Sequence, residues 1–199
     1  MHEGMLIQNL WVWLLLWFLS FISDYYLTLY GARLYRAYGR EHIVFGGSYE
    51  LTPFHQEAID ELRPISVRLL ALLVVSGIAI GLVWLLSIVV VQATWPFSLL
   101  MGGLLLRQAA VHVRHFRNLA LYRDAGVPGA LAGQIAYARW VVLHQSAVEL
   151  WGFAGLFLFA YLATGSLFLA GGALSCTVTG WQHYRLSRKA RQLATGGIP

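Results

Sequence analysis

Five long apolar stretches constrain what this chain can fold into. Backbone amides cannot hydrogen-bond to lipid, so an apolar run of about 18 residues or more enters a membrane as a helix. Charged residues make up only 12% of the chain, against about a quarter in soluble domains, which is too few to cover a water-facing surface. The sequence therefore predicts an all-α integral membrane protein, with residues 1–199 forming a single membrane domain. The predicted spans are residues 6–31, 69–92, 97–113, 136–163 and 167–182.

The 14 basic residues predict the orientation of these spans. Almost all of them lie on alternate connections and after the fifth span, whereas the other two connections, "ATWP" and "TGS", carry no charge. By the positive-inside rule, the N-terminus lies outside and the C-terminus in the cytoplasm. An odd number of spans requires the two ends to lie on opposite sides. We therefore expect a plasma (inner) membrane protein whose first span is retained as an anchor.

Short connections indicate that consecutive spans pack as antiparallel neighbours in a helical bundle. The longest connection, residues 35–67, is expected on the cytoplasmic side, with a short amphipathic helix over residues 54–63 that ends before Pro64. Its carboxylates are candidates to pair with the neighbouring cytoplasmic arginines. The sequence "GIAIG", Gly77 to Gly81, predicts a close approach between helices, either within this chain or in a homo-oligomer.

Polar residues within the spans are expected at a common depth. Counting inward from the flanking arginines at 1.5 Å per residue puts Asp24, Arg107 and Glu149 about 13 to 15 Å from the inner boundary. A polar layer at this depth also contains Ser76, Ser175, Cys176 and Thr177. A second shelf closer to the cytoplasm holds Thr28, His112, His144 and Gln145. Because the outer halves of the spans are apolar, the pattern predicts an intramembrane pocket that opens to the cytoplasm.

Arg107 defines the centre of this pocket. An arginine at the bilayer midplane costs at least about 2.5 kcal/mol and should face a counter-charge inside the bundle. Glu149, on the next helix along the chain, is the first candidate, and Asp24 is the second. We therefore predict that Arg107 lies between Glu149 and Asp24. Such a cluster either forms a site for a solute, ion or proton, or acts as a lock that fixes how the helices dock.

Histidine patterns leave two cofactor alternatives open. His112 and His115 are spaced so that both could bind one metal ion, and His112 with His144 could ligate a haem as two imidazoles. The metal interpretation lacks acidic or sulfur neighbours at ligand spacing. The sequence thus requires no cofactor and no metal. No phosphate-binding loop or nucleophile elbow is present, and no catalytic residue is assigned.

These patterns favour a multi-pass membrane protein that binds or carries a small solute, ion or proton. The lipid bilayer is its expected partner, and the basic residues are explained by topology and anionic lipid without a nucleic acid. A structural or assembly subunit of a larger membrane complex is the alternative from a different class. An enzyme that acts on a lipid-linked substrate is a third, less favoured alternative.

Overall fold

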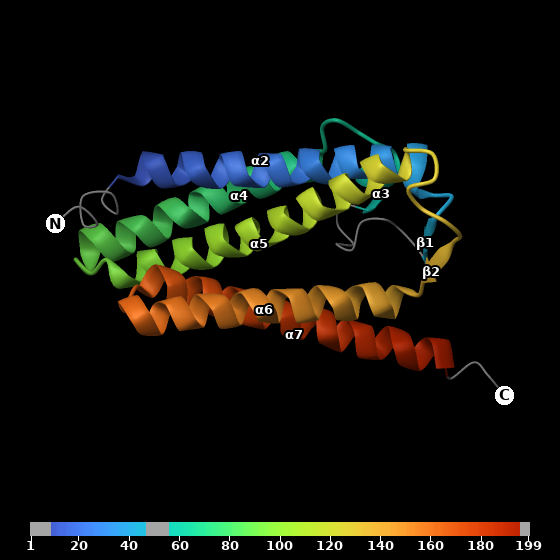
Figure 1. Ribbon diagram of the computed structural model, residues 1–199. Helices are drawn as coiled ribbons and strands as arrows, with labels where there is room; N and C mark the ends of the chain where they lie inside the picture. The colour runs from blue at the N-terminus through green and yellow to red at the C-terminus, as the bar shows by residue number, and fades with distance from the viewer. Residues whose placement is uncertain (1–8, 47–55, 196–199) are drawn as a thin grey trace.

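The computed structural model describes residues 9–46 and 56–195. The fold is all-α, as predicted. Two of its helices continue into short π-helical segments, α2 into η1 (Tyr35–Gly39) and α4 into η2 (Leu85–Val90). The α-helices are α2 (Leu10–Leu34), α3 (Gln56–Asp60), α4 (Val67–Trp84), α5 (Trp95–Ala125), α6 (Arg139–Thr164) and α7 (Leu167–Thr195) (Figure 1).

The long helices form two groups that lie side by side. Helices α2, α4 and α5 make up one group, and α6 and α7 make up the other (Figure 1). Helix α7 packs along both α6 and α5, whereas α6 scarcely touches α5. Since α5 and α7 run in the same direction (Figure 1), the principal contact between the groups is parallel. It is not the contact between consecutive antiparallel helices that the sequence led us to expect.

Two helices are much longer than their apolar runs. Helix α5 continues to Ala125 instead of ending near residue 113, and α7 continues to Thr195 instead of residue 182. In both cases charged and polar residues end the apolar run but not the helix, because arginine, lysine and glutamine are good helix formers. Helix α6, in contrast, ends at Thr164, one residue beyond the predicted end at residue 163, and it is followed by Gly165, whose φ of 69° is readily adopted only by glycine.

Other boundaries also differ from the predictions. The connection expected from residue 35 begins with the helical segment η1, so α2 and η1 together reach Gly39. Of the predicted surface helix, the residues before 56 lie outside the described part of the chain. The described part of that helix ends at Asp60 and not at residue 63, and Leu62 adopts a φ of 55° in the turn that follows.

A parallel two-stranded sheet joins the two groups at one end of the bundle, here called the strand end. Strand β1 (Ile43–Phe45) pairs with β2 (Ile135–Tyr137), with Val44 opposite Ala136. Strand β1 follows η1, and β2 leads directly into α6. The rings of Phe45 and Tyr137 stack at a centroid distance of 6.2 Å. The sheet therefore attaches the start of α6 to the end of the α2 group.

The opposite end of the bundle, called the far end, contains the connections at Thr94 and Gly165. Here Trp17, Ile80, Phe97 and Met101 form a buried apolar cluster that joins α2, α4 and α5. The outer surface is apolar as well, and α4 exposes leucine, isoleucine and valine side chains along most of its length. Among the described residues, three helical stretches are long and apolar enough to cross a membrane: Leu10–Gly39, Val67–Val90 and Arg139–Thr164.

Glycines bring the backbones of α5 and α7 into direct contact. A Cβ atom on Gly102 would lie 1.8 Å from the carbonyl oxygen of Phe168, and a Cβ atom on Gly171 would lie 2.0 Å from that of Leu99. Neither position has room for a side chain. Close packing of this kind is typical of helices in a membrane, where lipid removes the hydrophobic driving force between them. We call these two positions the glycine crossing.

The motif "GIAIG" does not play this role within the described chain. A Cβ atom on Gly77 would meet only the ring of Phe18, and one on Gly81 would have no atom within 4 Å. Of the close approach that we expected from "GIAIG", the described chain shows only that of Gly77 to the ring of Phe18, which would lie 2.8 Å from an added Cβ atom. The close approach depends on the adjacent glycine pairs 102–103 and 171–172 instead.

A hydrogen bond inside the bundle provides a test of how α2 packs on α4. Trp17 Nε1 donates to Ser76 Oγ at 2.8 Å. Replacing Trp17 with Phe should lower the free energy of unfolding by about 1 kcal/mol for the lost hydrogen bond. Trp84→Phe is the matched control, because Trp84 Nε1 is buried without an acceptor in the described chain. Thermal unfolding should show a loss for Trp17→Phe alone, and equal losses would contradict this packing.

Candidate functional site

A cavity of about 780 Å³ lies between the two helix groups, in the half of the bundle that includes the strand end. The second half of α5 forms its largest wall, and the other walls come from α2, α6, α7 and the two strands. The cavity thus lies in the region where α5 and α6 move apart toward the strand end (Figure 1). Its charged and histidine lining residues are Asp24, Arg107, Arg114, His115, Arg117, Arg139, Glu149 and His183.

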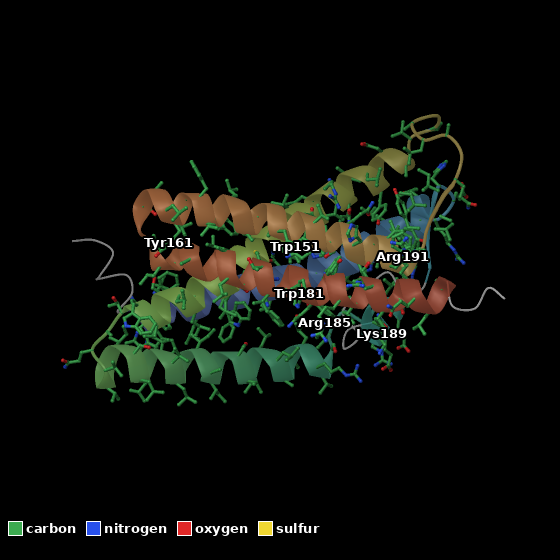
Figure 2. The ribbon with its side chains drawn as sticks, turned by 90° about the horizontal axis from the view of Figure 1, so that it is seen from below. Trp151, Tyr161, Trp181, Arg185, Lys189 and Arg191 are labelled. Atoms are coloured by element: carbon green, nitrogen blue, oxygen red, sulfur yellow. The ribbon has the colours of Figure 1, made fainter. Side chains whose placement is uncertain are left out.

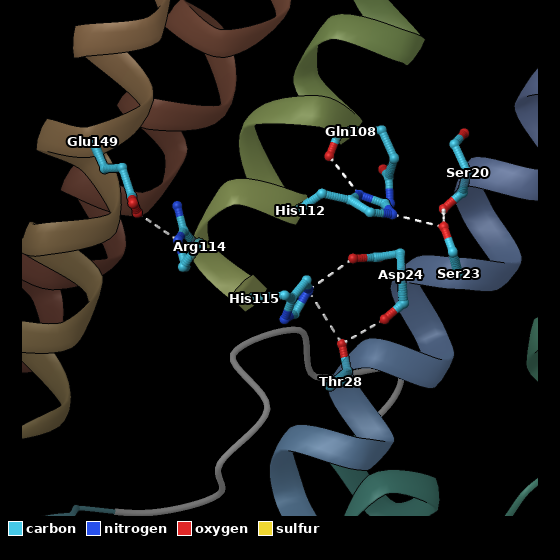
Figure 3. A network of polar contacts seen from close by, with 9 residues as sticks. All are labelled: Ser20, Ser23, Asp24, Thr28, Gln108, His112, Arg114, His115 and Glu149. Carbon is cyan, nitrogen blue, oxygen red and sulfur yellow. Dashed lines mark hydrogen bonds and ion pairs between the residues drawn. The ribbon is translucent and has the colours of Figure 1, made fainter. Parts of the chain in front are cut away.

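Glu149 is the acidic centre on the α6 side. Its carboxylate accepts a hydrogen bond from Arg114 Nε at 2.6 Å and one from Arg117 Nη1 at 3.1 Å. The Arg114 and Glu149 side chains are only 16% and 18% exposed, whereas Arg117 is 64% exposed. The pair between Arg114 and Glu149 is therefore shielded from water. It directly links α5 to α6, which otherwise barely touch (Figure 3).

Asp24 is the acidic centre on the α2 side. His115 Nε2 lies 2.8 Å from Asp24 Oδ1 and 3.3 Å from Thr28 Oγ1. Thr28 Oγ1 donates its proton to the backbone oxygen of Asp24, so His115 Nε2 must carry the proton that both oxygens accept. This arrangement fixes the tautomer of His115 with its proton on Nε2 (Figure 3).

Arg107 forms no direct ion pair with Glu149 or Asp24, the two carboxylates between which we predicted it. Glu149 pairs with Arg114 and Arg117, and Asp24 pairs with His115. The side chain of Arg107 lines the same cavity but makes no ion pair or hydrogen bond with any residue in 9–46 or 56–195. The three predicted residues thus share one cavity, although the partners differ.

His112 forms a second polar link between α5 and α2, outside the cavity lining. Its Nδ1 lies 2.8 Å from the carbonyl oxygen of Gln108 and must therefore donate. Its Nε2 lies 2.6 Å from Ser23 Oγ, which in turn lies 2.9 Å from the backbone oxygen of Ser20 (Figure 3). Ser23 has one hydroxyl proton for these two neighbours. The hydroxyl proton of Ser23 can therefore bond to only one of them at a time.

The remaining predicted site residues divide in two. Thr28 and Gln145 line the cavity. Ser76 accepts from Trp17, Cys176 is buried in the apolar cluster between α5, α6 and α7, and the hydroxyl of Thr177 bonds to its own helix. The ring of His144 lies beside that of Tyr184. The predicted residues that are not part of the cavity lining are Ser76, His112, His144, Ser175, Cys176 and Thr177.

Sequence reasoning did not place Arg114, His115 and Arg117 of α5 in the pocket, although it named His115 as a possible metal ligand, and it missed His183 of α7. Helical periodicity contains the signal, because residues 107, 111, 114 and 118 lie on one face of a continuous helix. Because the predicted third span ended at residue 113, the prediction left out the part of this face that lies beyond that residue. On α6, Arg139, Ser146 and Glu149 share one helical face and line the cavity.

The cofactor alternatives find little support in the geometry. Among the described residues, no group of three or more His, Cys, Asp and Glu side chains is placed to hold a metal ion. The rings of His112 and His115 lie 6.4 Å apart, edge to face, and each bonds to a different residue of α2. Within the described chain, both nitrogens of His112 are engaged, so haem ligation would require breaking a bond.

The fold and the cavity together define a helical bundle with an apolar outer surface and charged groups in its interior. This is the class of protein to which the chain belongs on physical grounds. Comparisons with known protein families, with curated proteins and with solved structures found no match. The argument for a function therefore rests on the cavity itself.

Proposed function

We propose that the protein is a multi-pass plasma-membrane protein that binds and carries a small solute in this cavity. In this proposal α2, α4, α5, α6 and α7 all cross the membrane, with the strand end in the cytoplasm and the N-terminus outside. Three of these helices are apolar and long enough to cross. Helices α5 and α7 complete the bundle, because their first halves pack into it through the glycine crossing.

The distribution of charge supports this orientation. Basic residues lie at or near the strand end, on η1, on the second half of α5, at the start of α6 and on the second half of α7. Arg185, Lys189 and Arg191 lie along one half of α7, as Figure 2 shows. Arg191 packs its guanidinium over the ring of Trp140 at 5.1 Å, an interfacial type of contact. The far end lacks such a cluster among the described residues.

The single observation that carries the proposal is the charged cavity inside an apolar bundle. Ionisable groups within a membrane protein are costly to bury and commonly mark substrate or ion pathways. A volume of about 780 Å³ also falls within the range of small-molecule sites, about 300 to 1,000 Å³. A lock that only fixed helix docking would need the ion pairs but not the space around them.

The far end supports a carrier over a pore. A pore needs a polar lining along its whole length. Here the polar cavity does not reach the far end, because the glycine crossing and an apolar cluster lie between them. The cluster consists of Trp17, Ile80, Phe97 and Met101. A solute in the cavity would be accessible from the strand end alone, as in one state of a carrier that alternates its access.

Filling the cavity tests the proposal. Val142 of α6 lines the cavity, whereas Val148 of the same helix is exposed on the outer surface. Native mass spectrometry of the gently extracted protein should detect a retained small molecule. Val142→Trp should lose this molecule, and Val148→Trp should keep it. A bound mass that both variants keep, or the absence of any bound mass from the native chain, contradicts a solute site.

A further inference from the structure

The lining of the cavity carries an excess of positive charge. Four arginines line it, at positions 107, 114, 117 and 139, against two carboxylates, Asp24 and Glu149. The excess is therefore two positive charges even when His115 and His183 are neutral. Both carboxylates are already engaged, Glu149 by two arginines and Asp24 by His115. A cationic ligand would enter a positive cavity in which each carboxylate already has a partner.

Three cationic donors in the cavity wall lack acceptors in the described chain. Arg107 and Arg139 make no hydrogen bond or ion pair with residues 9–46 or 56–195. Arg114 uses Nε for Glu149, while its Nη2 is buried without an acceptor in those ranges. Burying a charged donor without an acceptor costs free energy. A guanidinium is always charged in proteins, so it cannot avoid this cost by losing a proton. An acceptor from outside the chain would relieve it.

We infer that the cavity binds a phosphate- or carboxylate-bearing anion, which is attracted by the excess charge of Arg107, Arg114 and Arg139 and held by those of their donors that it reaches along the cavity. This inference deepens the proposed function and rests on it. Guanidinium groups match these anions because their planar donors form paired hydrogen bonds with two oxygens. The ligand is larger than inorganic phosphate, since the cavity also presents apolar side chains, among them Phe21, Val111 and Val142.

Such a ligand has two sources, a free organic anion from the cytoplasm or the headgroup of an anionic lipid. The experiment separates them with two probes on the full-length protein. The first is inorganic pyrophosphate, added to protein in neutral phosphatidylcholine nanodiscs with sodium chloride at matched ionic strength as the reference. The second is a nanodisc containing phosphatidylglycerol compared with one of phosphatidylcholine alone. The eight tryptophans report thermal unfolding by fluorescence.

At least one probe should raise the unfolding midpoint by about 3 °C or more at saturation. The increase should be lost in at least one of Arg107→Gln and Arg139→Gln, and it should be kept in Arg188→Gln. Arg188 is exposed on α7, outside the cavity lining, so this variant controls for net charge. Two cavity variants are included so that the test survives if one of them fails to fold. A response to pyrophosphate assigns a soluble ligand, and a response to phosphatidylglycerol alone assigns a lipid.

The inference is overturned if neither probe stabilises the native chain, or if all three arginine variants respond alike. Its failure is distinct from a failure of the solute site. One outcome is that Val142→Trp expels a bound molecule that proves to be neutral or cationic. In that case the cavity still binds a solute, and only the inference that the ligand is an anion is wrong. If Val142→Trp expels nothing, the solute site itself is wrong.

Discussion

Gly102→Ala is expected to remove most of the folded protein from a detergent extract. The added Cβ atom would lie 1.8 Å from the carbonyl oxygen of Phe168, so α5 and α7 must separate along their main contact. Overpacking a core typically costs about 1 to 3 kcal/mol. A clash with backbone, which cannot rotate away as a side chain can, belongs at or above the upper end of that range. Size-exclusion chromatography and thermal unfolding measure the loss.

Gly155→Ala is the matched control on the exposed side of α6. A Cβ atom there meets no atom within 4 Å, and alanine favours a helix over glycine by about 1 kcal/mol. This variant should be as stable as the native chain or slightly more stable. Gly171→Ala, with its Cβ atom 2.0 Å from the oxygen of Leu99, should fail as Gly102→Ala does. Equal stability of all three variants would mean that α5 and α7 do not touch at the glycine crossing.

Glu149→Gln is expected to cause the second large effect, a loss of about 3 kcal/mol in the free energy of unfolding. The amide keeps the shape of the side chain but removes the negative charge that Arg114 and Arg117 share. The Arg114 guanidinium is only 16% exposed, so it would remain charged and without a counter-charge. Unfolding in denaturant, followed by tryptophan fluorescence, gives the loss.

Two further variants show where this loss comes from. Arg117→Gln should cost no more than about 1 kcal/mol, because that side chain is 64% exposed and largely screened by water. The double variant Arg114→Met with Glu149→Leu should recover most of the stability that Glu149→Gln loses, since apolar residues can replace a shielded pair. If Arg117→Gln is as damaging as Glu149→Gln, the shielded pair is not the source of the effect.

The helices were predictable from the sequence, but their ends were less so. An apolar run in the sequence indicates the part of a helix that lipid or a core covers. Helices α5 and α7 continue well beyond their apolar runs, as helices rich in charged residues. Strands β1 and β2 have three residues each, too few for an alternating pattern to be recognised. The glycine crossing was missed because adjacent glycines do not indicate which helix they will face.

The site residues were partly predictable, but their partners were not. Asp24, Arg107 and Glu149 do line one cavity. The depth count assumed that Arg117 and Arg139 mark the same boundary, yet Arg117 itself reaches Glu149. Arg114, which pairs with Glu149, lies seven positions beyond Arg107, about 10 Å along α5. Residue counting gives a height only relative to its reference point, and it does not show how neighbouring helices are shifted or rotated.

The parallel strands have a mechanical consequence for the two helix groups. Ile135 N donates to His42 O at 2.8 Å, and Gly46 N donates to Tyr137 O at 2.9 Å, so main-chain bonds tether the groups at one end. At the other end the glycine crossing holds them in backbone contact. Pulling the groups apart breaks one attachment or the other. Rolling one group about the axis through both attachments would leave them intact, so the pair between Arg114 and Glu149, which joins the groups across the cavity, is the contact that opposes this movement.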